Sequence, residues 1–348
     1  MRVYLDRTVE PPRLPADNEV IEQLRSAKGS RLVRILEEAT IEPNAVLAHE
    51  THIEPNHFND NEPEWLYQLT TPLCEAYRAG DAEGAARLLE RGALVTRFVT
   101  LRDGSTASFH HTYVAYKVPD DAWTYREVLR PVPSADSRAA TARVLERAFT
   151  QELEAAARGA LAPADRERAL VCGLFLAIER GDRAAVDRWL AIGADPTLGG
   201  PGAVTAVGLA INLGDHKTAK TLLVSPDALE QICAWNIRAL SSPWGTLYPI
   251  RPLHLAAVCG DEAMLRLLLE RGADPAQGFP TCYPLQAHVM AHDRSRPDRG
   301  CLKALAAPTV RRLRETLGEE AMMKGLADYW SEGVLAHLER AGLVPRIR

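Results

Sequence analysis

The sequence lacks the features that would point to a secreted or membrane protein. Residues 1–15 contain no apolar core of signal-peptide length. No stretch reaches the roughly 18 apolar residues that a bilayer-spanning helix needs. The six cysteines are far apart and form no CxxC pair, so neither a zinc site nor a disulfide framework is indicated. We therefore expect a chain of the reducing cytoplasm that has no membrane partner.

The sequence also lacks an excess of positive charge and the common catalytic motifs. Its 348 residues carry a formal net charge of −5, which gives no electrostatic footprint for nucleic acid. The glycine-rich segment 199–202 is not followed by the Lys-Ser/Thr of a phosphate loop, and no Gly-x-Ser-x-Gly occurs. We expect no catalytic residue, no cofactor, no metal and no nucleic-acid partner. Heavy use of Ala, Arg, Leu and Pro suggests a GC-rich bacterial genome.

What the sequence does contain is an internal repeat. Its clearest copy, residues 251–275, reads RPLHLAAVCGDEAMLRLLLERGADP. The turn glycines of two other copies, Gly181 and Gly214, are 33 residues apart. The pattern of each copy is a helix, Gly-Asp, a second helix and Gly. Full or partial copies occupy 71–93, 173–196, 205–223 and 251–275, and weaker ones begin at 283 and 331.

This pattern resembles the ankyrin repeat, with Arg251 in place of the usual Thr before Pro. The resemblance implies short helix pairs that stack into an α-solenoid, because one pair cannot bury both of its faces. Pro252 suits the first helical position, Gly260 the positive φ that ends the first helix, and Asp261 the cap of the second. The family resemblance gives His254 a structural role. It also implies a protein partner, bound by finger loops and the exposed side of the first helix, and no enzymatic activity.

The fold expected is mostly α, with about five to six helix pairs and a β-hairpin in one inter-repeat finger. In the N-terminal part, residues 20–38 predict short helices broken at Gly29, and residues 43–63 predict a polar loop. The expected segments are an N-terminal cap at 1–68, a first repeat at 69–96, an insertion at 97–168, repeats at 169–305 with an enlarged finger at 225–250, and a C-terminal helical cap at 306–348.

The insertion contains signals for a hairpin and a helix. Two β-prone runs, 97–102 and 107–116, flank Asp103-Gly104 and predict a β-hairpin. A helix is expected from about 136 to 158. Its apolar stripe comprises Ala139, Ala142, Leu145, Phe149 and Leu153.

Aromatic and arginine residues near the fingers are the candidate partner contacts, because such residues dominate binding hot spots. The alternative is that the aromatic residues only pack the longer loop against its neighbour. The candidates are Trp235, Asn236, Arg238, Trp244, Tyr248 and Arg251 in the enlarged finger, Phe109, His111 and Tyr113 in the hairpin, and Tyr283 at the start of a weaker repeat.

Histidines offer an enzymatic alternative. Imidazole and carboxylate groups at short range can hold a metal, but the segment 49–57, HETHIEPNH, lacks the HExxH spacing, and Pro55 prevents a regular helix. His288 and His292 are four apart on an expected helix, with no third ligand apparent. The metal candidates are therefore His49, His52 and His57.

Three functional hypotheses follow. The first is a bacterial cytoplasmic immunity protein that neutralises a toxin or secreted effector. The second is an injected effector that binds host proteins. The third is an enzyme with a metal site in the N-terminal loop. The oligomeric state stays open.

Overall fold

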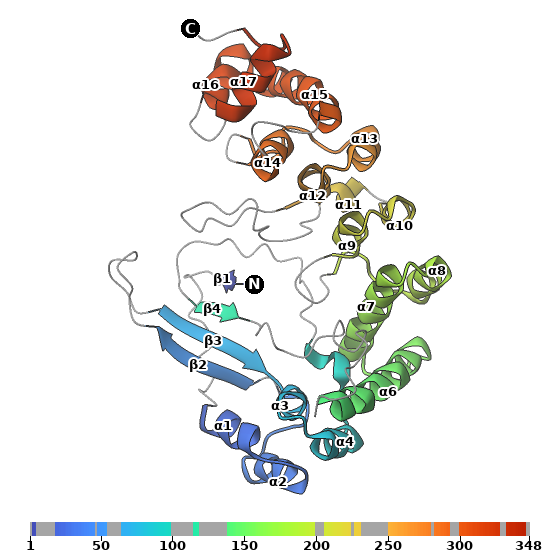
Figure 1. Cartoon of the computed structure of the whole chain (residues 1–348). Coiled ribbons are helices and arrows are strands. Elements are labelled where there is room, and N and C mark those ends of the chain that lie inside the picture. The colour runs from blue at the N-terminus through green and yellow to red at the C-terminus, as the bar shows by residue number, and fades with distance from the viewer. Residues whose placement is uncertain are drawn as a thin grey trace. The chain divides into compact units, whose positions relative to one another are not determined.

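The computed structural model shows a mostly helical chain that divides into two compact units (Figure 1). The N-terminal unit is Met1–Gly173 and the C-terminal unit is Leu174–Arg348. The described residues are 2–4, 18–45, 47–53, 64–98, 114–117, 138–198, 205–223, 226–230, 250–279, 282–292, 299–327 and 332–345. Within these ranges, no helix has the length and apolar character needed to cross a bilayer.

The N-terminal unit combines helix pairs with a small sheet. Its helices are α1 (Asn18–Ser26), α2 (Ser30–Glu38), α3 (Pro72–Arg78), α4 (Ala82–Glu90), the 3-10 helix η1 (Val95–Phe98), α6 (Arg138–Ala157) and the first part of α7 (Pro163–Glu179). Its strands are β1 (Arg2–Tyr4), β2 (Leu47–Ile53), β3 (Glu64–Thr70) and β4 (Val114–Lys117).

The helices of this unit stack pair on pair. Helix α1 packs on α3 and α2 packs on α4, so residues 18–38 form a helix pair that lies against the next one. Ile21 and Leu24 of α1 and Leu32 of α2 are completely buried, and Gly29 between the helices has a φ of 56°. The two short helices and their break at Gly29 are thus confirmed.

Helix α6 packs against α3, α4 and η1, and it confirms the helix expected from about 136 to 158. Leu145 is completely buried, and Ala142, Phe149 and Leu153 are at most 7% exposed. The apolar stripe read from the sequence is therefore the face by which α6 attaches to the stacked pairs.

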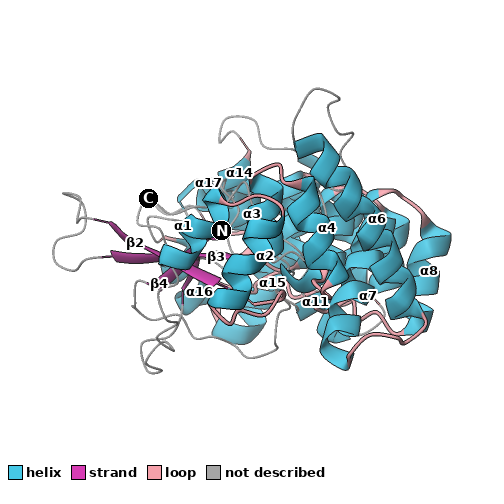
Figure 2. Cartoon of the chain, turned by 90° about the horizontal axis from the view of Figure 1, so that it is seen from below, coloured by secondary structure: helices cyan, strands magenta, loops and turns pink. Residues whose placement is uncertain are grey.

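The sheet was not expected in this form. Its strand order is β1-β4-β3-β2, with β3 and β4 parallel and the other neighbours antiparallel. Figure 2 shows the strands extending to one side of α1 and α2. The polar loop predicted at 43–63 is wrong in part, because residues 47–53 form β2 and pair along their whole length with β3.

The β-hairpin predicted in the insertion is not supported. Residues 95–98, where its first run was expected to begin, form the 3-10 helix η1, and β4 pairs with β1 and β3. The turn Asp103-Gly104 lies outside the described residues. The physical reason for the helical turn at 95–98 is a buried carboxylate from α6, described below.

The C-terminal unit is built from successive helix pairs. Its helices are the remainder of α7, α8 (Arg183–Ile192), α9 (Ala206–Asn212), α10 (His216–Leu222), α11 (Pro226–Glu230), α12 (Pro252–Cys259), α13 (Glu262–Glu270), α14 (Pro284–Ala291), α15 (Arg299–Leu317), α16 (Glu319–Leu326) and α17 (Glu332–Arg340). Helix α12 packs on α9, α13 and α14, and α15 and α17 cover α14.

The α12–α13 pair has the local structure that its sequence predicts. Pro252 stands at the start of α12, and Gly260 ends that helix in the left-handed conformation with a φ of 68°. The side chain of Asp261 accepts the N–H of Met264 at 2.9 Å and caps α13.

Some expected boundaries fall inside secondary-structure elements. Residue 68 lies in β3, residue 168 in α7 and residue 305 in α15. Helix α15 continues through Pro308, so the end of the repeats and the expected C-terminal cap share one helix.

We predict that Asp81→Ala costs more stability than the matched change Asp182→Ala. Both aspartates cap a helix, accepting N–H groups at 2.9 Å and 3.0 Å. Asp81 also accepts the N–H of Gly29 in the neighbouring pair at 2.6 Å. Losing the cap alone should cost about 1 kcal/mol, and leaving a buried donor unsatisfied should raise the cost of Asp81→Ala to roughly 2–3 kcal/mol. Urea unfolding measures both, and equal losses would contradict the second role.

Candidate protein-binding surface

The first helices of three consecutive pairs in the C-terminal unit expose little of their length. Residues 206–211 of α9, 252–257 of α12 and 284–289 of α14 are all buried. Exposure begins only in the last turn, at Asn212 and Leu213 after α9 and at Cys259 in α12. The side of the first helix that a partner could touch is therefore restricted to its C-terminal end.

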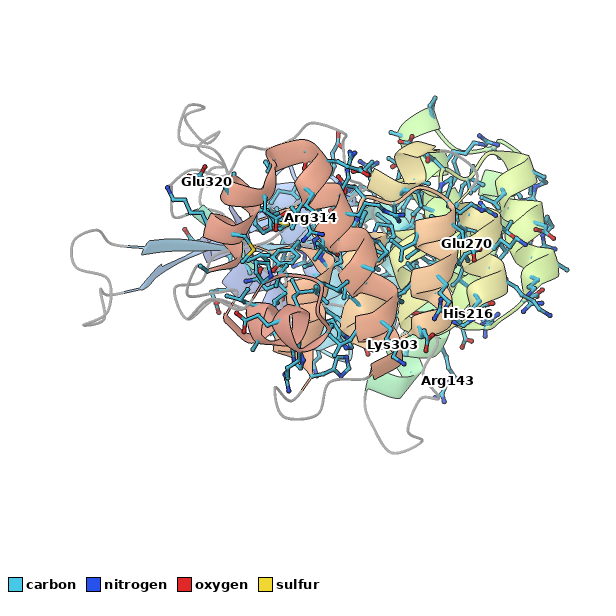
Figure 3. The ribbon with its side chains drawn as sticks, turned by 90° about the horizontal axis from the view of Figure 1, so that it is seen from above. Arg143, His216, Glu270, Lys303, Arg314 and Glu320 are labelled. Carbon is cyan, nitrogen blue, oxygen red and sulfur yellow. The ribbon has the colours of Figure 1, made fainter. Side chains whose placement is uncertain are left out.

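The turns that follow these ends are tied to one another by side chains. Arg183 Nη2 lies 3.5 Å from Asp215 Oδ1, and His216 Nε2 lies 2.6 Å from Asp261 Oδ2. Each contact joins the start of one second helix to the cap of the next. Figure 3 labels His216 at the start of α10. The ties arrange residues 180–183, 212–216 and 259–261 in sequence, and we call these residues the turn edge.

The turn edge has an exposed leucine at its centre. Leu213 is 50% exposed, and the only other large apolar side chain of the described residues with comparable exposure is Leu317 at 46%. Arg180 and Lys217, on either side of the α9–α10 turn, are exposed and polar. An apolar centre with a charged surround is the composition of a protein contact site.

Histidines in the first helices hold neighbouring pairs together. Buried His254 donates from Nε2 to the carbonyl oxygen of Cys282, at 3.1 Å, immediately before α14. His288 of α14 donates from Nδ1 to the carbonyl oxygen of Ala257 at 2.8 Å, and its ring centroid lies 4.5 Å from that of His292. The structural role expected for His254 is confirmed.

Burial makes the His254 ring a neutral one. Removal from water lowers the pKa of His254 from 6.5 to about 4, and Arg251 adds to that effect, while the hydrogen bond to Cys282 opposes it. A neutral ring with a fixed donor can pair with a carbonyl oxygen inside the stack at no cost of buried charge.

Most of the sequence-predicted contact residues lie outside the described residues. These are Phe109, His111, Tyr113, Trp235, Asn236, Arg238, Trp244 and Tyr248. Arg251 is described and half-buried, and its Nε donates to the carbonyl oxygen of Glu230 at 3.0 Å. Arg251 thus ties α11 to the start of α12 and retains part of its surface exposed.

Tyr283 does not qualify as a contact residue. Its side chain is completely buried, and its ring lies 5.2 Å from that of Phe279, centroid to centroid. The prediction of a partner contact at Tyr283 is wrong, because packing before α14 removes the ring from solvent.

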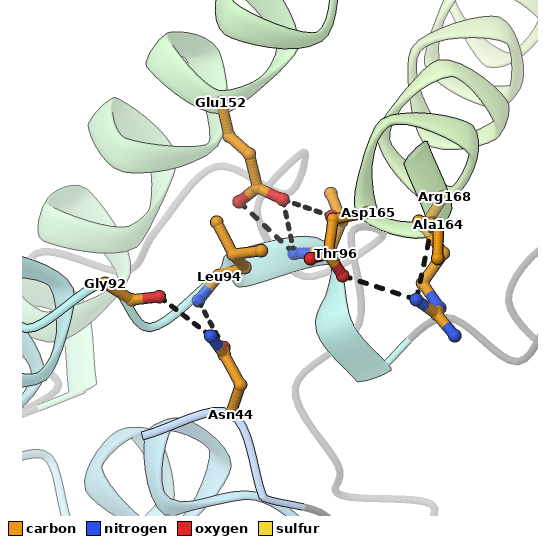
Figure 4. Close-up of polar contacts among 8 residues, drawn as sticks. All are labelled: Asn44, Gly92, Leu94, Thr96, Glu152, Ala164, Asp165 and Arg168. Carbon is orange, nitrogen blue, oxygen red and sulfur yellow. Dashed lines mark hydrogen bonds and ion pairs between the residues drawn. The ribbon is translucent and has the colours of Figure 1, made fainter. Parts of the chain in front are cut away.

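A second structural site secures the base of the insertion in the N-terminal unit (Figure 4). Glu152 of α6 accepts the N–H of Val95 at 2.7 Å and that of Thr96 at 3.2 Å, and it also pairs with the Thr96 hydroxyl. From the other side, Asn44 accepts the N–H of Leu94 at 2.7 Å and donates to the carbonyl oxygen of Gly92 at 2.8 Å. These bonds satisfy backbone groups in helical rather than extended geometry, which explains η1.

The metal hypothesis finds no support in the described residues. Their His, Cys, Asp and Glu side chains form no group of three that could hold a metal ion. His49 and His52 occupy positions of β2 that are three apart, and an odd spacing in a strand does not place two positions on one face. His57 lies outside the described residues.

The cysteines of the C-terminal unit resemble structural thiols. Burial raises the pKa of the Cys282 thiol to about 11, and burial followed by the charge of Asp261 raises the pKa of Cys259. Reactive cysteines show the opposite shift, because the thiolate is the nucleophile.

The packing and turn chemistry of the α12–α13 pair now meet the comparison with protein families. Residues 251–278 match the family model for the ankyrin repeat. No curated protein matches the chain. The match supports an ankyrin-repeat protein, and ankyrin repeats are typically protein-interaction modules without enzymatic activity.

Sequence reasoning missed the residues that the ankyrin architecture leaves exposed. Leu213 stands directly before the turn glycine Gly214, where Cys259 stands before Gly260. An apolar residue at the one first-helix position that stacking does not bury is a signal visible in the sequence, once the repeats are aligned. Glu152 gave no such signal, because its partners lie 56 and 57 residues away.

We predict that Glu152→Ala lowers the free energy of unfolding by roughly 2–4 kcal/mol, because buried N–H groups lose their acceptor. Glu154→Ala is the matched control on the same helix, since Glu154 is exposed and makes only a 3.8 Å ion pair with Arg158. Its cost should be near zero. Equal costs in urea unfolding would contradict the role of Glu152.

A pH series should separate the charge of Glu152 from its shape. Burial raises the pKa of Glu152 above 4.5, although the hydrogen bonds from Thr96 and Val95 oppose this. The folded chain therefore holds this proton more tightly than the unfolded chain. Relative to Glu152→Gln, the stability of the wild-type chain should fall as the pH rises through the raised pKa.

His254 should give the opposite slope. Its pKa falls to about 4 in the folded chain, so the unfolded chain takes up a proton first as the pH drops below 6.5. Stability should decline by up to ~3 kcal/mol between pH 6.5 and 4, and His254→Gln, which keeps a donor, should remove this part of the decline. Parallel curves for the two proteins in urea unfolding would rule out the His254 contribution.

Proposed function

We propose that the chain is a protein-binding ankyrin-repeat module whose partner contacts the turn edge around Leu213. The observation that carries the proposal is a half-exposed leucine at the centre of that edge. Covering it would contribute on the order of 1 kcal/mol from apolar area alone. A hot spot needs such a residue on a surface that is otherwise polar.

The turn edge is also ordered before a partner arrives. The Arg183–Asp215 and His216–Asp261 contacts fix neighbouring turns, and Asp215 caps its own helix by accepting the N–H of Thr218 at 3.1 Å. A surface held in this way loses little conformational freedom on binding, which favours affinity.

The finger residues extend the proposed surface. Arg251 adjoins the enlarged finger at 225–250, whose aromatic residues Trp235, Trp244 and Tyr248 are of the type that dominates hot spots. Their contribution is a proposal from the sequence, which a scan of single alanine substitutions would test in the same binding assay.

The biological role we favour is a bacterial cytoplasmic immunity protein that neutralises a toxin or secreted effector. A repeat module with enlarged fingers and no recognised catalytic motif is suited to masking another protein. Co-expression with the toxin encoded beside its gene should restore growth. Continued growth arrest, together with export of this chain in a secretion assay, would favour the alternative of an effector that binds host proteins.

Leu213→Asp is predicted to weaken partner binding by about tenfold or more, since it puts a charge into an apolar contact. Leu317→Asp is the matched control, because Leu317 has nearly the same exposure but lies at the end of α15. The measurement is capture of partner proteins by each variant, quantified by mass spectrometry and followed by titration. Equal capture by the two variants would remove the turn edge from the proposal.

A further inference from the structure

The outer edge of β2 is the second feature that could receive a partner. β2 is the last strand in the order β1-β4-β3-β2, and all seven of its residues pair with β3 on the other side. Among the described residues no strand pairs with its outer edge. Helix α1 packs beside β2, and Leu47 at the start of the strand is buried. The rest of the strand leaves alternate backbone N–H and C=O groups directed away from the sheet.

This edge lacks the usual protection against strand addition. Proteins shield exposed edges with short strands, bulges, prolines or lysines. The opposite edge strand, β1, has three residues, whereas β2 has seven and its register with β3 runs from Leu47–Thr70 to Ile53–Glu64 without a bulge. The sequence of β2, LAHETHI, contains no proline, lysine or arginine.

Charge favours a foreign strand over a second copy of this chain. Two copies of β2 paired antiparallel along their full length would place position 50 opposite position 50. Residue 50 is glutamate, and like charges directly opposite each other destabilise a strand pair. A strand with lysine or arginine at that place would be stabilised instead.

We propose that the outer edge of β2 binds an extended segment of a partner protein as an added strand, with a basic residue opposite position 50. The inference rests on the proposed protein-binding function and names a second contact for it. Main-chain hydrogen bonds to the edge supply affinity, and the residue opposite Glu50 supplies selectivity.

The test uses the full chain and two synthetic probes. One peptide is Thr-Val-Thr-Lys-Thr-Val-Thr, and the other has glutamate in place of the lysine. Hydrogen exchange of residues 47–53 is measured with each peptide in excess. The lysine peptide should slow exchange in β2, and the glutamate peptide should bind about fivefold more weakly.

A charge exchange provides the control. Glu50→Lys should reverse the preference, so that the glutamate peptide becomes the better ligand while the melting temperature is unchanged. No protection of β2 by either peptide would overturn the inference, as would slow exchange of every β2 amide in the free protein. Concentration-dependent dimers that protect β2 would assign the edge to a second copy instead.

These outcomes are separable from those for the turn edge. If Leu213→Asp abolishes partner capture and the peptides leave β2 unprotected, the added strand is excluded and the proposed function stands. If β2 is protected but Leu213→Asp has no effect, the turn edge is excluded and the added strand stands.

Discussion

Each short helix pair of this chain depends on its neighbours to cover its apolar side. The dependence is plainest at α12, which packs on α9, α13 and α14 and whose residues 252–257 are all buried. A pair with so little surface of its own could not be stable in isolation, so the fold exists only as a stack. The same constraint decides what remains outside, because stacking buries the first helices except at their last turn.

Polar groups add direction to this apolar stacking. Aspartates after the turn glycines cap the second helices, and Asp81, Asp215 and Asp261 also accept a contact from the neighbouring pair. Within each first helix, a buried histidine such as His254 reaches the backbone of the next pair. Apolar contact alone would allow one pair to slide along another, whereas these bonds are made in one register only.

Local signals explain what the sequence could predict. Pro252, Gly260 and Asp261 each act within one turn of their own position, and the stripe of α6 repeats at helical spacing, so all were readable. The strand β2 and the helical turn η1 depend on partners elsewhere in the chain. β2 is polar and became legible only beside β3, whose run Glu64–Thr70 contains Trp65, Leu66 and Tyr67. η1 depends on Glu152, on a helix beyond the insertion. Burial of Tyr283 depends likewise on contacts that no local pattern records.

The division between stacked and free positions also tells where function can reside. A residue that fills the stack is selected by volume, and its neighbours limit what it can be. The last turn of a first helix is under no such limit, and Arg180, Leu213 and Cys259 differ in chemistry at that place. Water would favour a polar residue at a half-exposed position. A leucine there gains nothing from the fold, so its benefit lies in a contact that forms when another molecule covers it.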